Sequence, residues 1–141
     1  MSFAPRITLE SSSPQETESA GADLAARLSA GDVVLVSGEL GTGKTTFVRG
    51  ACRALGIEGP VTSPTFTIGH VLGGDPEVAH LDLYRLGTLA AEDPALLDDY
   101  VTADRIAFVE WPAVGEPAFE RVAARVLLEH LGGDRRRITI V

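Results

Sequence analysis

One stretch decides the fold of this chain: residues 33–45, which read VVLVSGELGTGKT. Its first part, residues 33–37, is a short apolar run rich in valine, which is typical of a strand buried in a parallel sheet. The rest, residues 38–45, fits the pattern G-x-x-x-x-G-K-[ST], the loop that wraps the phosphates of ATP or GTP. A buried strand that ends in this loop predicts an α/β fold of the P-loop NTPase type, with a central mixed sheet flanked by helices and with antiparallel hairpins.

Each position of the loop has a physical task. Gly38 ends the strand, while Gly41 and Gly43 allow positive φ angles that turn successive backbone N–H groups toward an anion. Lys44 adds a full positive charge near the β- and γ-phosphates, and the hydroxyl of Thr45 is placed to bind Mg²⁺. The sequence therefore predicts a nucleotide site that works with Mg²⁺.

Size and charge narrow the class of protein. The chain has 141 residues and a net charge of −8, and this length predicts one domain over residues 1–141. A protein that grips a nucleic-acid backbone needs clustered Lys and Arg, so the acidic balance indicates that any RNA is held by a partner. The single cysteine, Cys52, is expected in the core and fits a cytoplasmic protein. No run approaches the ~18 apolar residues of a membrane span.

Capping signals predict the helices. Ser13 to Glu16 form a capping box with Pro14 at the first helical position, so a helix is expected to start there and to run toward Gly31. A second helix is expected over residues 45–55, directly after the loop, with its positive end toward the phosphates. A short third helix is expected at residues 94–100.

Turn signals and alternation predict the remaining strands. Residues 66–72 and 78–84 lie on either side of a Gly-Gly-Asp-Pro turn, which indicates an antiparallel hairpin. Residues 106–109 are another buried apolar strand. The tail, residues 124–141, reads as a second hairpin, with a helix over residues 123–131 as the alternative.

Two acids are candidates to complete a hydrolytic site. Glu110 directly follows a buried strand, and Asp82 lies on a hairpin strand whose direction relative to the other strands is left open. Thr65 lies in the loop after the second helix, where a hydroxyl could approach Mg²⁺ or the γ-phosphate. Trp111 follows Glu110, and Arg85 is a candidate arginine finger. The simpler alternatives are a solvated carboxylate for Asp82, a capping acid for Glu110, a turn residue for Thr65 and core packing for Trp111.

The chain carries four ordered motifs: GELGTGKTT at 38–46, SPTFT at 63–67, HLDLYRL at 80–86 and VEW at 109–111. Together they resemble the TsaE family, the small bacterial ATPases of tRNA threonylcarbamoyladenosine (t6A) biosynthesis. The resemblance extends over nearly the whole chain. It implies that ATP and Mg²⁺ are bound and that the protein acts with TsaD and TsaB, which modify adenosine 37 of tRNAs reading ANN codons.

The resemblance also implies roles for individual residues. It assigns phosphate and Mg²⁺ binding to Lys44 and Thr45, and it assigns metal binding and catalysis to Asp82 and Glu110. It places nucleotide contacts at the rest of the loop and near it, at Gly38, Gly41, Thr42, Gly43, Thr46, Thr65 and Trp111. Thr42 stands where the family often has Ala or Ser, the segment expected to contact adenine matches weakly, and Arg136 is a further candidate nucleotide contact.

Two other functions use the same loop. A small-molecule phosphotransferase is disfavoured by the short chain, which has no evident arginine-rich lid, and it would move the γ-phosphate to an acceptor instead of water. An ATP-dependent switch module would keep its partner function with ATP bound but uncut. Substitution of Glu110 would distinguish that switch from a hydrolase.

Overall fold

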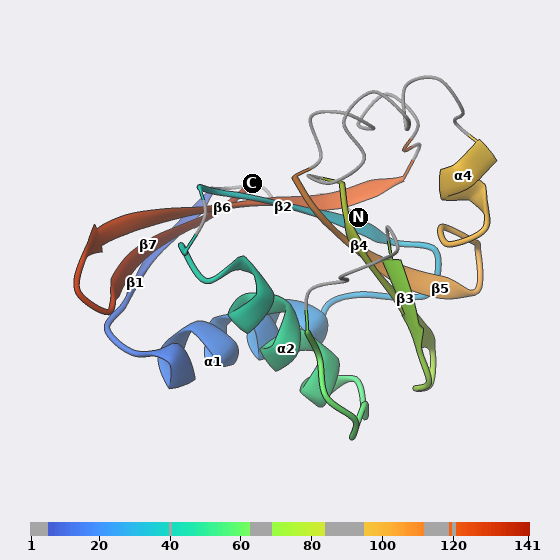
Figure 1. Cartoon of the computed structure of the whole chain (residues 1–141), viewed down its shortest axis with the longest axis horizontal. Coiled ribbons are helices and arrows are strands. Elements are labelled where there is room, and N and C mark those ends of the chain that lie inside the picture. The colour runs from blue at the N-terminus through green and yellow to red at the C-terminus, as the bar shows by residue number, and fades with distance from the viewer. Residues whose placement is uncertain (1–5, 40, 63–68, 84–94, 112–118, 120) are drawn as a thin grey trace.

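A seven-stranded mixed sheet, in the order β1-β7-β6-β2-β5-β4-β3, forms the centre of the protein in a computed structural model (Figure 1). The structure describes residues 6–39, 41–62, 69–83, 95–111, 119 and 121–141. Its elements are β1 (Ile7–Ser11), α1 (Pro14–Ala25), β2 (Val33–Ser37), α2 (Lys44–Ala54), β3 (Gly69–Leu72), β4 (Glu77–Asp82), α4 (Ala95–Asp98), β5 (Arg105–Glu110), β6 (Val122–Gly132) and β7 (Arg135–Ile140). The predicted α/β class and mixed sheet are confirmed.

The strands that lead to the predicted site are parallel. β2 pairs in parallel with β5 on one side and β6 on the other, and β4 pairs in parallel with β5. Their carboxyl ends therefore meet at one edge of the sheet, which is where ligands bind in open α/β sheets. The open question about Asp82 is thereby answered: β3 runs antiparallel to β4, while β4 runs in the same direction as its neighbour β5.

Antiparallel strand pairs lie on both sides of these parallel strands. β3 and β4 form the predicted hairpin, and β6 and β7 form the second one, so the tail is strand and the alternative helix over residues 123–131 is wrong. β1 pairs antiparallel with β7 and was not predicted from the sequence. Its burial pattern shows why: four of its five residues are only partly buried or exposed, so it lacks the apolar run that marks a core strand.

The two long helices lie side by side against one face of the sheet (Figure 1). α1 begins at the predicted cap, where the Ser13 hydroxyl accepts from Glu16 N at 3.1 Å, but it ends at Ala25, before the predicted boundary near Gly31. The helices approach closely through two glycines. A Cβ at Gly21 would collide with the Phe47 carbonyl oxygen, and a Cβ at Gly50 would collide with the backbone of Glu18.

Apolar side chains fill both faces of the sheet. The larger cluster lies between the sheet and α1 and α2, and it includes Phe47, Phe108 and Cys52. Burial raises the pKa of the Cys52 thiol to about 12, which fits the predicted core role. A smaller cluster on the opposite face joins β2, β4 and β5 to Leu97 of α4 and to Phe119. None of the helices in the described ranges is long and apolar enough to cross a membrane.

Candidate nucleotide-binding site

The loop between β2 and α2 has the backbone that an anion site needs. Gly38, Gly41 and Gly43 have φ angles of 147°, 78° and 95°, values that side-chain-bearing residues rarely adopt. A Cβ at Gly38 would also lie 2.6 Å from the Leu128 carbonyl oxygen, so this position has no room for a side chain. Gly43 is the N-cap of α2, and the helix therefore points its free N–H groups and positive end into the loop.

Lys44 is buried beneath this loop and held by it. Its Nζ donates to the carbonyl oxygens of Gly38 at 2.7 Å and Glu39 at 2.9 Å. Burial lowers the pKa of Lys44 below its ordinary value, while the carboxylates of Glu110 and Asp82 act in the opposite direction. The ammonium group is therefore fixed against the loop backbone, in the lining of the cavity.

The two predicted acids lie side by side at the ends of neighbouring strands. Asp82 of β4 and Glu110 of β5 are direct partners in the parallel register, and both are buried. The Thr45 hydroxyl donates to the Glu110 carboxylate, at 3.0 Å from Oε2 and 3.2 Å from Oε1. Glu110 is therefore not a simple capping acid, because it reaches the loop residue that is predicted to bind metal.

A cavity of about 360 Å³ joins these groups. Its described lining is Gly41, Gly43, Lys44, Thr45, Thr46, Asp82, Glu110, Trp111 and Arg136. A smaller hollow of about 40 Å³ adjoins it at Gly43, Thr46 and Arg136, and it extends to Pro14 and Thr17 of α1 and to Asp134. The structure thus brings together most of the predicted site residues. Thr65 and Arg85 lie outside the described residues.

The oxygen atoms at the cavity suit Mg²⁺ together with a phosphate. Thr45, Asp82 and Glu110 supply hydroxyl and carboxylate oxygens, the ligands that this hard cation prefers. Within the described ranges, no group of three or more His, Cys, Asp and Glu side chains could hold a metal by itself. Two carboxylates and one hydroxyl fit Mg²⁺, which usually binds through one or two carboxylates together with water and substrate phosphates.

Comparison with known proteins supports this assignment of the fold. A family model described as "Threonylcarbamoyl adenosine biosynthesis protein TsaE" matches residues 11–138. The chain belongs to the TsaE family. Its relatives include the tRNA threonylcarbamoyladenosine biosynthesis protein TsaE of Streptomyces coelicolor, at 48% identity over 81% of this chain and 79% of the relative. The protein of that name from Bacillus subtilis is 36% identical over 89% of this chain and 79% of its own length.

A solved structure has the same fold. The crystal structure of Bacillus subtilis YdiB superposes with a TM-score of 0.79 and 30% sequence identity, covering 99% of this chain and 87% of that chain. The α/β fold expected from the resemblance to TsaE proteins is therefore confirmed.

Arg136 braces the loop of this TsaE-family protein from the far end of the chain. Its Nε donates to Thr42 O and its second terminal nitrogen donates to Gly41 O, both at 3.1 Å. The guanidinium group also lines the cavity. The sequence indicates Arg136 as a candidate nucleotide contact, but the hold on residues 41 and 42 depends on how the β6–β7 hairpin folds back over the loop.

Trp111 has an unusual backbone conformation beside the acids. Its φ angle is 58°, a left-handed value that costs a bulky residue of order 1–3 kcal/mol. Its N–H donates to the Val36 carbonyl at 3.2 Å, and its ring lies over Lys44 Nζ. Trp111 lines the cavity, so the alternative of plain core packing does not describe it.

His80 is a further residue at the site that the sequence did not predict. Its side chain is fully buried, and Nε2 lies 2.5 Å from Glu110 Oε2. Among the residues that the structure describes, Nδ1 has no hydrogen-bond partner, and a buried polar atom left in this way costs about 1–3 kcal/mol. His80 and Asp82 share one face of β4, and the register of β4 with β5 brings His80 to Glu110.

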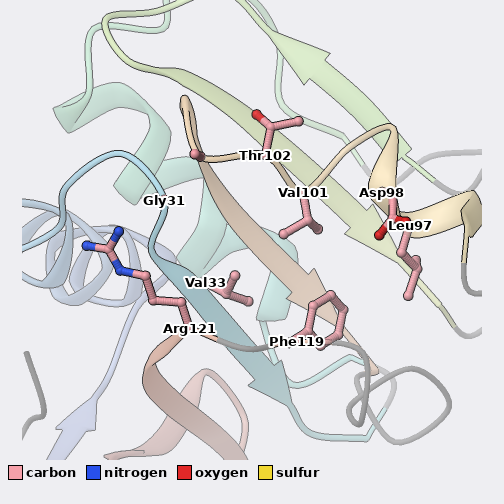
Figure 2. Close-up of a pocket in the computed structure, with 9 residues that line it drawn as sticks. Gly31, Val33, Leu97, Asp98, Val101, Thr102, Phe119 and Arg121 are labelled. Atoms are coloured by element: carbon pink, nitrogen blue, oxygen red, sulfur yellow. The ribbon is translucent and has the colours of Figure 1, made fainter.

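A second cavity, of about 340 Å³, lies at the opposite ends of the strands (Figure 2). Val33, Leu97, Val101 and Phe119 supply its apolar lining, and Figure 2 shows Arg121 and Asp98 on opposite sides of it. Arg121 already forms an ion pair with Asp32 at 3.3 Å. Since Val33 is the first residue of β2 and the phosphate loop follows the last, this cavity is separate from the nucleotide site.

Proposed function

We propose that this protein is a Mg²⁺-dependent ATPase that acts with TsaD and TsaB in the threonylcarbamoyl modification of adenosine 37 in tRNAs reading ANN codons. The names of its relatives support the pathway. One observation carries the proposed chemistry: the hydrogen bond from Thr45 to Glu110. It places a carboxylate against the hydroxyl that holds Mg²⁺ in loops of this sequence.

The residues divide the work of hydrolysis among them. Lys44 and the loop N–H groups would hold the β- and γ-phosphates, and Thr45 and Asp82 would hold Mg²⁺, which would supply charge neutralisation on the phosphate oxygens. A water oxygen forms a bond to the γ-phosphorus while the bond to the β–γ bridging oxygen breaks, which releases ADP. Glu110 is the proposed acceptor of the proton that the water loses.

A labelled substrate tests the reaction class. With ATP labelled in the γ-phosphate, we expect the label to appear as inorganic phosphate in a Mg²⁺-dependent reaction. Glu110→Gln should keep ATP bound while slowing its cleavage, because the amide keeps the shape but cannot take up the proton. Label in an acceptor molecule would instead indicate a phosphotransferase. A Glu110→Gln protein that cleaves ATP at the parental rate would contradict the proposed role of that residue.

Measuring ATP turnover with and without TsaD and TsaB tests whether the protein acts in this pathway. We expect low turnover by the protein alone and a higher rate with the TsaD–TsaB pair, because Arg136 is the sole arginine in the described cavity lining and it is engaged with the loop. A charge-neutralising group supplied by a partner can be worth ~10³–10⁵ in rate. The protein's net charge of −8 should make the association salt-sensitive if the partner surface is basic.

Formation of t6A on tRNA then separates a hydrolase from a switch. If Glu110→Gln supports modification as well as the parent does, ATP serves as a switch only, and hydrolysis is not required. If t6A formation falls in proportion to ATP cleavage, the hydrolytic role is supported.

A further inference from the structure

His80 occupies the boundary between the core and the nucleotide site. On the helix-facing side of the sheet, the register of β4 and β5 stacks three pairs: Val78 with Ile106, His80 with Phe108, and Asp82 with Glu110. The first pair belongs to the large apolar cluster, whereas the last lines the cavity. His80 is therefore one layer beneath the two acids, on the strand that also carries Asp82.

From this layer His80 reaches diagonally to Glu110. Its Nε2 is 2.5 Å from Oε2, and both side chains are almost fully buried. An ionised carboxylate can only accept hydrogen bonds, so the ring must carry its hydrogen on Nε2. Thr45 donates to the same carboxylate from the side of α2. Glu110 is thus held between one donor from the sheet and one from the loop.

We propose that His80 is a positioning residue that fixes the Glu110 carboxylate for ATP cleavage; this inference rests on the proposed function. The Thr45 hydroxyl lines the cavity, so a bound metal or nucleotide would share it with Glu110. The His80 contact comes from a fully buried ring and does not depend on the ligand. It keeps Glu110 in one orientation before and after the nucleotide arrives.

The residues around His80 distinguish this role from plain packing. An apolar side chain at this buried position would have no polar atom that needs a partner. The imidazole, in contrast, leaves Nδ1 without a partner among the described residues. What the imidazole adds is one N–H directed at a carboxylate. Partners of metal-binding or catalytic carboxylates typically account for 10–100-fold in affinity or activity when they are removed.

Three variants test the role through cleavage. His80→Phe removes the donor and keeps a large side chain, His80→Gln offers an amide N–H₂ where Nε2 lies, and Val78→Ala is the matched packing control from the same strand face. Single-turnover cleavage at saturating Mg·ATP should fall by about tenfold or more in His80→Phe, with the ATP dissociation constant within about threefold of the parent. Val78→Ala should lower thermal stability without this loss of rate, and His80→Gln should recover most of the rate.

A double-variant comparison shows whether His80 acts through Glu110. In a Glu110→Gln background, His80→Phe should cause no further loss of the residual rate. Parental cleavage by His80→Phe overturns the inference, and so does an equal loss in His80→Phe and His80→Gln. An additional loss in the Glu110→Gln background would also overturn it.

A spectroscopic measurement keeps the inference independent of hydrolysis. Long-range ¹H–¹⁵N spectra of the imidazoles, assigned by loss of a signal in His80→Gln, should show His80 protonated at Nε2, with a shift that changes in Glu110→Gln. If Nε2 carries no proton, or if its signal is unchanged in Glu110→Gln, His80 does not donate a hydrogen bond to Glu110. If neither the parent nor any variant cleaves ATP, or if Glu110→Gln cleaves it at the parental rate, the proposed function fails. The spectra then show by themselves whether His80 contacts Glu110.

Discussion

Lys44 and Trp111 form a cation–π pair: Nζ lies 4.2 Å from the centroid of the indole ring. The same ammonium group donates to two loop carbonyls. A phosphate that binds in the loop competes for this charge, because charge-assisted hydrogen bonds are roughly twice as strong as neutral ones. Nucleotide binding should therefore change the surroundings of Trp111.

Intrinsic fluorescence can report that change, since Trp111 is the only tryptophan. We expect ATP or ADP to alter its emission with a saturable dose response. Lys44→Ala should abolish productive nucleotide binding and erase the response, because it removes the positive charge of the phosphate loop. An emission spectrum that is unchanged by saturating nucleotide would show that the Trp111 ring does not contact the nucleotide site.

The lowered pKa of Lys44 predicts an alkaline limit for ATP binding. Only the protonated amine attracts phosphate, and burial makes this amine lose its proton at a lower pH than an exposed lysine, whose pKa is about 10.4. ATP affinity should therefore decline as pH rises, starting below that value. Titrations of ATP at several pH values test this, with Lys44→Arg as a control that stays charged. An affinity that is constant up to pH 10.5 would contradict the expectation.

Asp82→Asn should raise the Mg²⁺ requirement and slow hydrolysis together. The amide keeps an oxygen at the cavity but removes the negative charge that helps to hold the cation. We expect the Mg²⁺ concentration for half-maximal cleavage to rise by about tenfold or more. ATP binding without metal should change little. Unchanged Mg²⁺ dependence would remove Asp82 from the metal site.

The contribution of the Arg136 hydrogen bonds to the loop can be tested by comparing Arg136→Ala with Arg137→Ala. Arg136→Ala removes both hydrogen bonds to the loop carbonyls, each worth about 1 kcal/mol, so ATP affinity and melting temperature should both fall. Arg137→Ala is the matched control, because Arg137 is exposed and has an ion pair with Glu129 at 3.9 Å, worth ~0–1 kcal/mol. Equal effects of the two substitutions would show that Arg136 has no special hold on the loop.

The close contacts of glycine between α1 and α2 predict that a Gly→Ala substitution there destabilises the protein, although this substitution usually stabilises a helix. Alanine in place of glycine usually stabilises a helix by about 1 kcal/mol, but at Gly21 the new Cβ would meet the Phe47 carbonyl. We expect Gly21→Ala to destabilise the protein by ~1–3 kcal/mol in urea unfolding. Gly59→Ala should be nearly neutral, since a Cβ there has no atom within 4 Å. A stabilised Gly21→Ala would mean that the helices are not in close contact there.

Local patterns sufficed for the features that local chemistry controls. The phosphate loop, both hairpins and the acid that ends β5 could be predicted, because apolar runs, turn residues and glycine spacing are read within a few residues. The direction of β4 could not, since it depends on pairing with β5, more than twenty residues later in the chain.

The residues that were missed depend on contacts between distant segments. β1 is an edge strand whose partner, β7, lies at the other end of the sequence, and its own residues carry little apolar signal. The brace from Arg136 and the contact from His80 likewise arise from how the sheet aligns segments. In each case the side chain looks ordinary until the register of the strands is known.

The order in which the sheet is assembled has a consequence for synthesis of the protein. Residues 38–45 are made before β6, whose Leu128 carbonyl packs against Gly38, and before Arg136 of β7. A ribosome-bound chain lacking these strands has the phosphate-binding sequence without its supports. Nucleotide binding should therefore wait until β6 and β7 have been made, and a product truncated before them should bind ATP more weakly.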